Sequence, residues 1–163
     1  MSKPLDGIRV LEVAMYGFVP SAGAVLADWG AEVIKVEPPG GDDSRNWLPY
    51  VDRDGHRESA YYMSANRNKR SVVLDLKDPD GADRLRWLVS HADVLVENYR
   101  PGVLDRLGLG WEGLGAANPR LIWCSISGFG QTGPWATHGG LDMMAQGMSG
   151  LMAGNGPPGG EPY

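Results

Sequence analysis

The feature that most constrains the fold is a strand–helix–strand unit at the start of the chain. Residues 9–13 have the composition of a short strand, residues 20–29 are nearly all small and apolar as in a buried helix, and residues 33–36 return as a second strand. Pro20 suits a first helical turn and Gly30 suits the end of a helix. Because a strand that returns through a helix favours parallel pairing with a right-handed crossover, this unit predicts a parallel sheet.

The alternation of strands and helices continues along the chain. Further β-rich runs occupy residues 72–74, 94–96 and 121–126. After the first of these, Asp78 and Pro79 predict the start of a helix whose apolar positions extend to Ala92. An apolar helical stripe follows at Leu141, Met144, Ala145, Met148, Leu151 and Met152. This pattern predicts an α/β fold, in which an open parallel sheet carries helices on both faces.

Two segments depart from this rhythm. Residues 42–66 combine Gly, Asp, Arg, Pro and Tyr without a clear period, and we interpret them as an excursion over the surface. Residues 154–163 form a Gly/Pro-rich run that ends a helix and leads to no further element. We therefore expect residues 1–163 to be a truncated part of a longer chain.

Composition narrows the location and the partners. A net charge of -5 and a pI near 5.1 argue against a nucleic-acid partner, because binding to phosphate backbones needs many cations. The apolar runs are shorter than a membrane span, and the N-terminus lacks the apolar region of a signal peptide. The single cysteine, Cys124, is typical of a reducing compartment, so we expect a cytoplasmic protein with no membrane partner.

Ligands of an open parallel sheet gather beyond the carboxyl ends of its strands. The segments expected at that edge are rich in polar, aromatic and glycine residues, and they comprise residues 14–18, 37–41, 75–77, 97–102 and 127–131. A nicotinamide-binding Rossmann unit is the obvious alternative, since Glu37 lies where a ribose-binding acid belongs. Residues 14–18, however, lack the glycine triplet that lets a backbone approach a pyrophosphate. Glu37 is then either a solvated acid at a strand end or a ligand contact.

The densest positive cluster in this acidic chain is the run Asn-Arg-Asn-Lys-Arg-Ser at residues 66–71. Arginine, lysine and amide groups all bind phosphate oxygens, so Asn68 and Arg70 are candidate phosphate ligands, with an exposed solvated loop as the alternative. Tyr99 is a candidate to stack on an adenine ring, although a buried aromatic at a strand end is more common. Additional positive charge near the same edge comes from Lys77, Arg100 and Arg106.

Five ordered motifs carry a resemblance to a known family. They lie at residues 7–12, 26–37 (LADWGAEVIKVE), 66–71 with 74–77, 93–103 (DVLVENYRPGV) and 125–134 (SISGFGQTGP). Together they resemble the family III CoA-transferases, a group that includes formyl-CoA and carnitine CoA-transferases and the α-methylacyl-CoA racemases. The resemblance implies a Rossmann-like fold, with residues 1–163 as the N-terminal part of the large CoA-binding domain of an interlocked homodimer.

The resemblance also implies the ligand and its contacts. Coenzyme A would enter as a thioester substrate together with a carboxylic acid acceptor, with no tightly bound cofactor and no metal. Carried over by motif, the residues expected to border the CoA nucleotide are Leu74, Lys77, Asn98, Tyr99 and Arg106. Asn68 and Arg70 join them as the phosphate candidates from the basic cluster.

Family transferases use an aspartate carboxylate that attacks the thioester carbonyl, forming an aspartyl anhydride and then an enzyme–CoA thioester. The resemblance places this aspartate beyond Tyr163, so the nucleophile is unassigned within the chain. Asp142 corresponds to an acid that borders the site, and we expect it to have a supporting role or to begin a helix.

Three residues bear on the type of reaction. Racemases of the family have a histidine base directly before the acid that corresponds to Asp142. Here that position is Leu141, which cannot accept a proton. His138 lies three residues before Leu141, and we interpret it as a surface histidine and not as the base. Gly17 stands where formyl-CoA transferase has a glutamine that contacts reaction intermediates. This difference disfavours formyl and oxalyl substrates. The predicted function is therefore an acyl-CoA:carboxylate CoA-transferase, with a racemase or a catalytically incomplete CoA-binding fragment as the alternatives.

Overall fold

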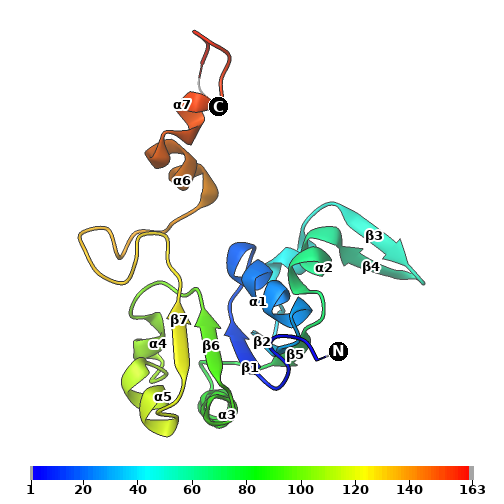
Figure 1. Cartoon of the computed structure of the whole chain (residues 1–163), viewed down its shortest axis with the longest axis vertical. Coiled ribbons are helices and arrows are strands. Elements are labelled where there is room, and N and C mark those ends of the chain that lie inside the picture. Colours follow the sequence, from blue (N-terminus) through cyan, green and yellow to red (C-terminus); the bar gives the residue numbers. More distant parts are fainter. Residues whose placement is uncertain (1, 162–163) are drawn as a thin grey trace. The chain divides into compact units, whose positions relative to one another are not determined.

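The structure, a computed structural model, describes residues 2–161 apart from the side chain of Arg53. It separates into two compact units, residues 1–126 and 127–163, which are described in turn. The first unit contains a five-stranded sheet with the order β5-β2-β1-β6-β7, which can be followed in Figure 1. Its strands are β1 (Arg9–Val13), β2 (Glu32–Glu37), β5 (Arg70–Val73), β6 (Val94–Glu97) and β7 (Ile122–Ser125).

All four neighbouring strand pairs are parallel, as predicted. Strand β1 lies in the centre, where Leu11 pairs with Ile34 of β2 on one side and with Leu95 of β6 on the other. The order of the strands reverses between β1 and β6. The carboxyl ends of these two strands therefore form the topological switch point, where open α/β sheets bind their ligands.

Four helices cover the two faces of the sheet: α1 (Phe18–Asp28), α3 (Pro79–Ser90), α4 (Val103–Arg106) and α5 (Trp111–Ala117). Successive side chains of a strand point to opposite faces, so Val10 packs in the core beneath α1 while Leu11 packs in the core beneath α3. The prediction of an α/β sheet with helices on both faces is confirmed.

Helix α1 is made of small residues because it packs closely over the sheet. A Cβ atom on Gly23 would lie 1.9 Å from Oε2 of Glu12, a fully buried carboxylate of β1. A larger residue at position 23 would displace that carboxylate. Helix α3 begins as the sequence predicts, since Asp78 accepts a hydrogen bond from the backbone N–H of Asp80 at 2.9 Å and Pro79 follows it in the first turn.

Residues 42–66 are more ordered than the interpretation as a surface excursion predicts. They form the 3-10 helix η1 (Asp43–Asn46), an antiparallel hairpin of β3 (Tyr50–Arg53) and β4 (His56–Ser59), and α2 (Ala60–Asn66), which packs against α1. Asp42 and Ser44 are completely buried. Most of the segment lies on the surface, as predicted, since residues 45–49 and 54–58 are exposed. Asp42 is buried because its partner, Lys35, comes from elsewhere in the chain, which no local period reveals.

The second unit contains the predicted apolar helix in two pieces, α6 (Asp142–Ser149) and α7 (Leu151–Gly154). They are separated by Gly150, whose φ of 81° lies in the left-handed region that favours glycine. Within residues 142–154, all of which the structure describes, no side chain is buried. The apolar stripe is therefore exposed in this chain, and Leu141, directly before α6, is 72% exposed.

No helix within residues 2–161 combines the length and the hydrophobicity that crossing a bilayer requires. The longest, α3, has 12 residues and a mixed polar and apolar surface.

The packing of α3 gives a first prediction. Leu85 is 1% exposed in the core between α3 and the sheet, so Leu85→Ala in the natural full-length protein should lower the free energy of unfolding by about 2–5 kcal/mol. Urea unfolding followed by circular dichroism measures this loss. The neighbouring exposed Arg84→Ala should change it by less than about 0.5 kcal/mol. Equal effects of the two substitutions would contradict the described packing.

Candidate functional site

The loops that follow β1 and β6 meet at the switch point of the sheet. Asn98, directly after β6, donates a hydrogen bond from Nδ2 to the carbonyl oxygen of Met15 at 2.8 Å and accepts one at Oδ1 from the N–H of Met15 at 3.2 Å. Met15 lies two residues after the end of β1. One amide side chain thus joins the two loops where the fold places its ligand.

The loop after β1 has an unusual backbone conformation. Tyr16 has a φ of 70°, a conformation that residues other than glycine rarely adopt and that costs about 1–3 kcal/mol. Its N–H points to Oδ1 of Asp42 at 3.4 Å, and its hydroxyl donates to Oδ2 of Asp43 at 3.0 Å. The hydrogen bond to Asp43 raises the pKa of the Tyr16 hydroxyl above its usual value.

An aromatic cluster lies beside this loop. The ring of Tyr16 stacks on Trp47 with 5.6 Å between centroids, and Trp47 contacts Tyr61 at 5.1 Å. All three rings are partly exposed, so they offer an apolar surface close to the carboxyl end of β1. No sequence pattern predicted that Trp47 and Tyr61 lie here. The high aromatic content of residues 47–62 was the only signal, since the contacts depend on how the hairpin and α2 fold back.

Five predicted ligand residues follow the carboxyl ends of β5 and β6: Leu74, Lys77, Asn98, Tyr99 and Arg106. Leu74 belongs to the core cluster on the α3 side of the sheet, and Tyr99 packs against the same cluster. Burial raises the pKa of the Tyr99 hydroxyl, with a smaller contribution from Glu97, so the phenol stays neutral. Lys77 and Arg106 are exposed, and both therefore present their positive charge to solvent at this edge.

Asn68 and Arg70 lie at the opposite edge of the sheet. Arg70 is the first residue of β5, and its guanidinium donates to Oε1 of Glu32, at the amino end of β2. Asn68 donates to Oδ1 of Asp28 at 2.7 Å, at the end of α1. The expectation that these residues share an edge with Asn98 was wrong. The residues before a parallel strand and those after it are separated by the length of the strand, and both side chains already bind acids.

The rest of the basic cluster is also occupied by structural contacts. Arg67 binds Asp28 through Nε and Nη2 at 3.0 and 2.5 Å. Lys69 is buried, with its Nζ 2.8 Å from Oε2 of Glu12 and 2.7 Å from the carbonyl oxygen of Pro20. Two of the three cations, Arg67 and Lys69, are therefore engaged with α1, while Arg70 forms a largely exposed ion pair with Glu32 of β2.

A buried ionic network lies between the sheet and α1. The ammonium of Lys35, a residue of β2 that is 1% exposed, is 3.1 Å from Oε1 of Glu12 and 2.9 Å from Oδ2 of Asp42. Lys69 binds the other side of Glu12, so the network contains two lysines and two acids. Burial alone would raise the pKa of Asp42, but hydrogen bonds from Ser44 and Lys35 lower it below its usual value. These four groups are therefore mutually neutralised in the interior.

Glu37, at the carboxyl end of β2, is neither solvated nor free to bind a ligand. It is 1% exposed, and Arg45 binds it through Nε at 2.8 Å and Nη2 at 2.7 Å. Tyr62 and Ser71 also donate to Oε1, and the N–H of Asp42 donates to Oε2. Burial acts to raise its pKa, yet these hydrogen bonds lower it to about 2. Both interpretations from the sequence were wrong, because the partners of Glu37 come from η1 and α2.

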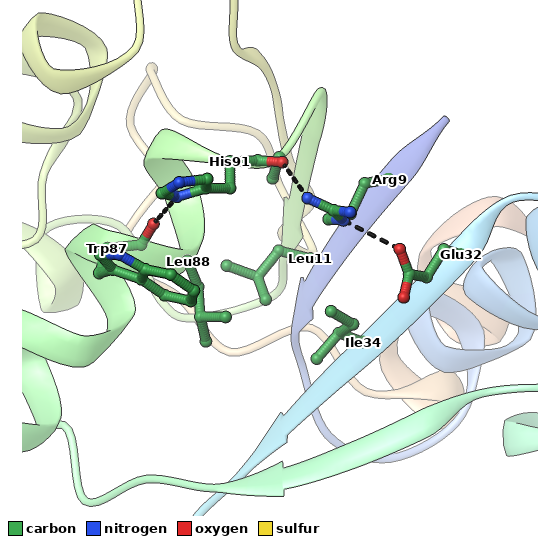
Figure 2. Close-up of a pocket in the computed structure, with 8 residues that line it drawn as sticks. Arg9, Leu11, Glu32, Ile34, Trp87, Leu88 and His91 are labelled. Atoms are coloured by element: carbon green, nitrogen blue, oxygen red, sulfur yellow. Dashed lines mark hydrogen bonds and ion pairs between the residues drawn. The ribbon is translucent and has the colours of Figure 1, made fainter. Parts of the chain in front are cut away.

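A small cavity opens at the other end of the sheet, near the amino ends of β1 and β2. Figure 2 shows Leu11 and Ile34 beside Trp87 and Leu88 of α3, with Arg9 bonded to Glu32 and to the carbonyl oxygen of His91. Its volume is about 200 Å³, below the range of roughly 300–1,000 Å³ that is typical of ligand pockets. Its small size, and its place at the end of the sheet opposite to the switch point, make it a poor candidate for the functional site.

Within residues 2–161 no three His, Cys, Asp or Glu side chains are grouped so that they could hold a metal ion. In the second unit, Asp142 is the first residue of α6 and accepts a hydrogen bond from Gln146 at 2.5 Å. His138 is exposed and its ring contacts Trp135 and Phe129.

A parallel sheet whose strand order reverses between β1 and β6, with helices on both faces, defines a doubly wound α/β domain. The sequence profile of CoA-transferase family III matches residues 5–163. The chain belongs to that family.

Named relatives agree with this assignment. The chain is 53% identical over 163 residues to a succinate–glutarate CoA-transferase of Agrobacterium fabrum, covering 98% of this chain and 41% of the relative. It is 47% identical over 160 residues to an acetyl-CoA:oxalate CoA-transferase of Acetobacter aceti, covering 98% of this chain and 40% of the relative. The chain thus spans about two fifths of the length of these relatives.

A solved structure shows the same fold. A CAIB/BAIF family protein from Brucella suis superposes with a TM-score of 0.95 at 48% identity, over 100% of this chain and 43% of that protein. The expected family and its Rossmann-like fold are therefore confirmed, and the chain corresponds to an N-terminal part of the family's proteins.

The contacts of Glu37 predict a pH dependence of stability. Its folded-state pKa of about 2 lies below the ordinary value of 4.5, so the ionised carboxylate stabilises the fold above about pH 4.5 and this contribution is lost as the pH falls towards 2. In the full-length protein, Glu37→Gln should cost on the order of 3 kcal/mol at neutral pH.

Urea unfolding between about pH 6 and pH 3 should show the stability gap between wild type and Glu37→Gln narrowing as the pH falls. The exposed Glu112→Gln is the matched control and should change stability little at any of these pH values. A gap for Glu37→Gln that stays constant over this range would show that the carboxylate is not held in its ionised form.

Proposed function

We propose that the natural full-length protein containing this chain transfers coenzyme A between carboxylic acids, with dicarboxylic acids as donor or acceptor. The observation that carries the proposal is the 53% identity, over nearly the whole chain, to a relative named for succinate and glutarate. The Acetobacter aceti relative is named for oxalate, which is also a dicarboxylic acid, so two carboxylates on the substrate are the common chemical feature of these names. Gly17 disfavours oxalate itself as the substrate of this protein.

Coenzyme A would bind along the carboxyl edge of the sheet. Exposed Lys77 and Arg106 can pair with its phosphates, since both lie beyond strand ends and the structure gives neither an ion pair within residues 2–161. Leu74 and Tyr99 would border the nucleotide on the apolar side. Asn98 would act mainly by fixing the loop after β1, because its amide already bonds both backbone groups of Met15. The CoA thioester is a substrate in this proposal and not a bound cofactor.

The reaction would proceed by nucleophilic catalysis through an aspartate outside residues 1–163. Its carboxylate oxygen attacks the thioester carbonyl, the C–S bond breaks, and CoA leaves as the thiolate from an aspartyl anhydride. The thiolate attacks the aspartyl carbonyl, which releases the donor acid and leaves an enzyme–CoA thioester. The acceptor carboxylate then attacks the enzyme–CoA thioester, which releases the thiolate and forms a second anhydride. The thiolate attacks the acyl carbonyl of this anhydride, which forms the new acyl-CoA and frees the aspartate. Asp142 would support this site, and Leu141 offers no group that could remove an α-proton, which favours transfer over racemisation.

The exposed apolar residues of the second unit support a larger assembly. Leu141, Met143 and Leu151 are each more than half exposed, and no residue of α6 or α7 is buried. A surface of this kind is normally covered by protein, and we propose that the rest of the chain and a second subunit cover it in an interlocked homodimer. We also propose a cytoplasmic location, consistent with the single unpaired Cys124.

The activity can be tested directly. The full-length protein should convert succinyl-CoA and glutarate into glutaryl-CoA and succinate in equal amounts, as measured by mass spectrometry of the thioesters. Incubation with succinyl-CoA alone should leave protein whose mass is increased by one CoA less one water. Epimerisation of an α-methylacyl-CoA without any exchange of acid would instead support a racemase, and hydrolysis alone would contradict transfer.

The proposed CoA edge can be tested by comparing two exposed cations. Lys77→Ala should raise the KM for succinyl-CoA about 10-fold with little change in kcat, because one charged hydrogen bond to phosphate is lost. Arg70→Ala, at the amino edge of the same strand, should change KM less than about twofold. If Arg70→Ala raised the KM for succinyl-CoA more than Lys77→Ala, the phosphates would bind at the basic cluster of residues 66–71 and not at the carboxyl edge.

A further inference from the structure

Lys35 is buried directly beneath the loop that follows β1. Its ammonium donates a hydrogen bond to the carbonyl oxygen of Ala14 at 2.6 Å, the shortest of its contacts, and Ala14 is the first residue after β1. The same ammonium pairs with Oδ2 of Asp42 at 2.9 Å, while Oδ1 of Asp42 faces the N–H of Tyr16 at 3.4 Å. The ammonium of Lys35 therefore bonds Ala14 directly. Through the carboxylate of Asp42 it also holds the N–H of Tyr16.

The loop needs such restraints because its conformation is strained. Tyr16 has a φ of 70°, and strained backbone of this kind persists only when surrounding contacts fix it. Asn98 holds Met15 from the side of β6, and Lys35 with Asp42 holds Ala14 and Tyr16 from the side of β2. The two sets of contacts hold Ala14, Met15 and Tyr16 at the switch point, where a doubly wound fold binds its ligand.

We propose that Lys35 is a positioning residue for the transfer reaction: its buried ammonium fixes the loop 14–17 and thereby orients the substrate at the switch point. The proposal rests on the proposed CoA-transferase activity and adds a residue that does not itself touch the substrate. Misplacement of a reactant by about 1 Å can lower a rate about 100-fold, so a contact that fixes a loop has a measurable effect on catalysis.

Lys69 provides a matched control. Like Lys35, it is a buried lysine of the same network and it binds the same carboxylate, Glu12. Its other contacts are different, because they go to the carbonyl oxygen of Pro20 in α1 and to Oδ1 of Asn66 in α2. Replacing either lysine by methionine removes one buried charge, but only Lys35→Met releases the loop.

The test uses the full-length protein and its CoA exchange between succinyl-CoA and glutarate. Lys35→Met should lower kcat about 10- to 100-fold while the KM for succinyl-CoA changes much less, whereas Lys69→Met should keep kcat within about threefold. Both should lower the melting temperature by similar amounts. If Lys35→Met does not fold, the double variant Lys35→Met/Asp42→Asn replaces it, because Lys69 and Glu12 then remain as a balanced pair. This double variant should also lower kcat about 10- to 100-fold.

A second readout does not depend on activity. Hydrogen–deuterium exchange of the peptide that contains residues 14–17 should become at least about 10-fold faster in Lys35→Met and stay unchanged in Lys69→Met. Equal losses of kcat in the two variants, or unchanged kcat in folded Lys35→Met, would overturn the positioning role. A wild-type protein that transfers no CoA would overturn the proposed function and the catalytic role with it, while the exchange data would still decide whether Lys35 fixes the loop.

Discussion

The structure depends on the buried ionic network that joins Lys35, Glu12, Lys69 and Asp42. Removing four charged groups from water is costly, and the cost is offset only when every group finds partners of opposite charge at short distance. The network connects β1, β2, the turn at Asp42 and the segment before β5, so elements far apart in the chain must all be in place for it to be satisfied. It also explains why α1 carries glycine and alanine where it crosses Glu12.

The two edges of the sheet have different roles. At the amino edge, Arg9 and Arg70 both bind Glu32, and Arg67 and Asn68 bind Asp28, so each of these three arginines is paired with an acid. At the carboxyl edge, the acids Glu37 and Asp42 are buried and paired, while Lys77 and Arg106 remain exposed. Two acids of that edge are thus withdrawn into the interior, whereas Asp75 and Asp105 stay exposed close in the chain to Lys77 and Arg106.

The loop 14–17 at the switch point is held by polar contacts while part of it stays exposed. Its backbone is bonded from both neighbouring strands, and the Tyr16 ring remains partly exposed beside Trp47. The strain at Tyr16 is thus balanced by polar contacts to Asn98, Lys35 and Asp42. Lys35 belongs both to the buried ionic network and to the contacts that hold the loop 14–17. The conformation of this loop therefore depends on the same interactions that stabilise the interior.

The sequence alone determined the order of strands and helices, the parallel pairing, the cap at Asp78 and the family. These depend on local periodicity, on chain connectivity and on motifs that are each a short continuous run of residues. Only the tertiary structure decided that Asn68 and Arg70 lie at the edge of the sheet opposite to Asn98. The same holds for the enclosure of Glu37 by Arg45 and Tyr62. It also holds for the contacts of Trp47 with Tyr16 and Tyr61. The physical reason is that the partner of a charged or aromatic side chain is set by strand register and by the return path of a loop. Neither leaves a local pattern in the residues themselves.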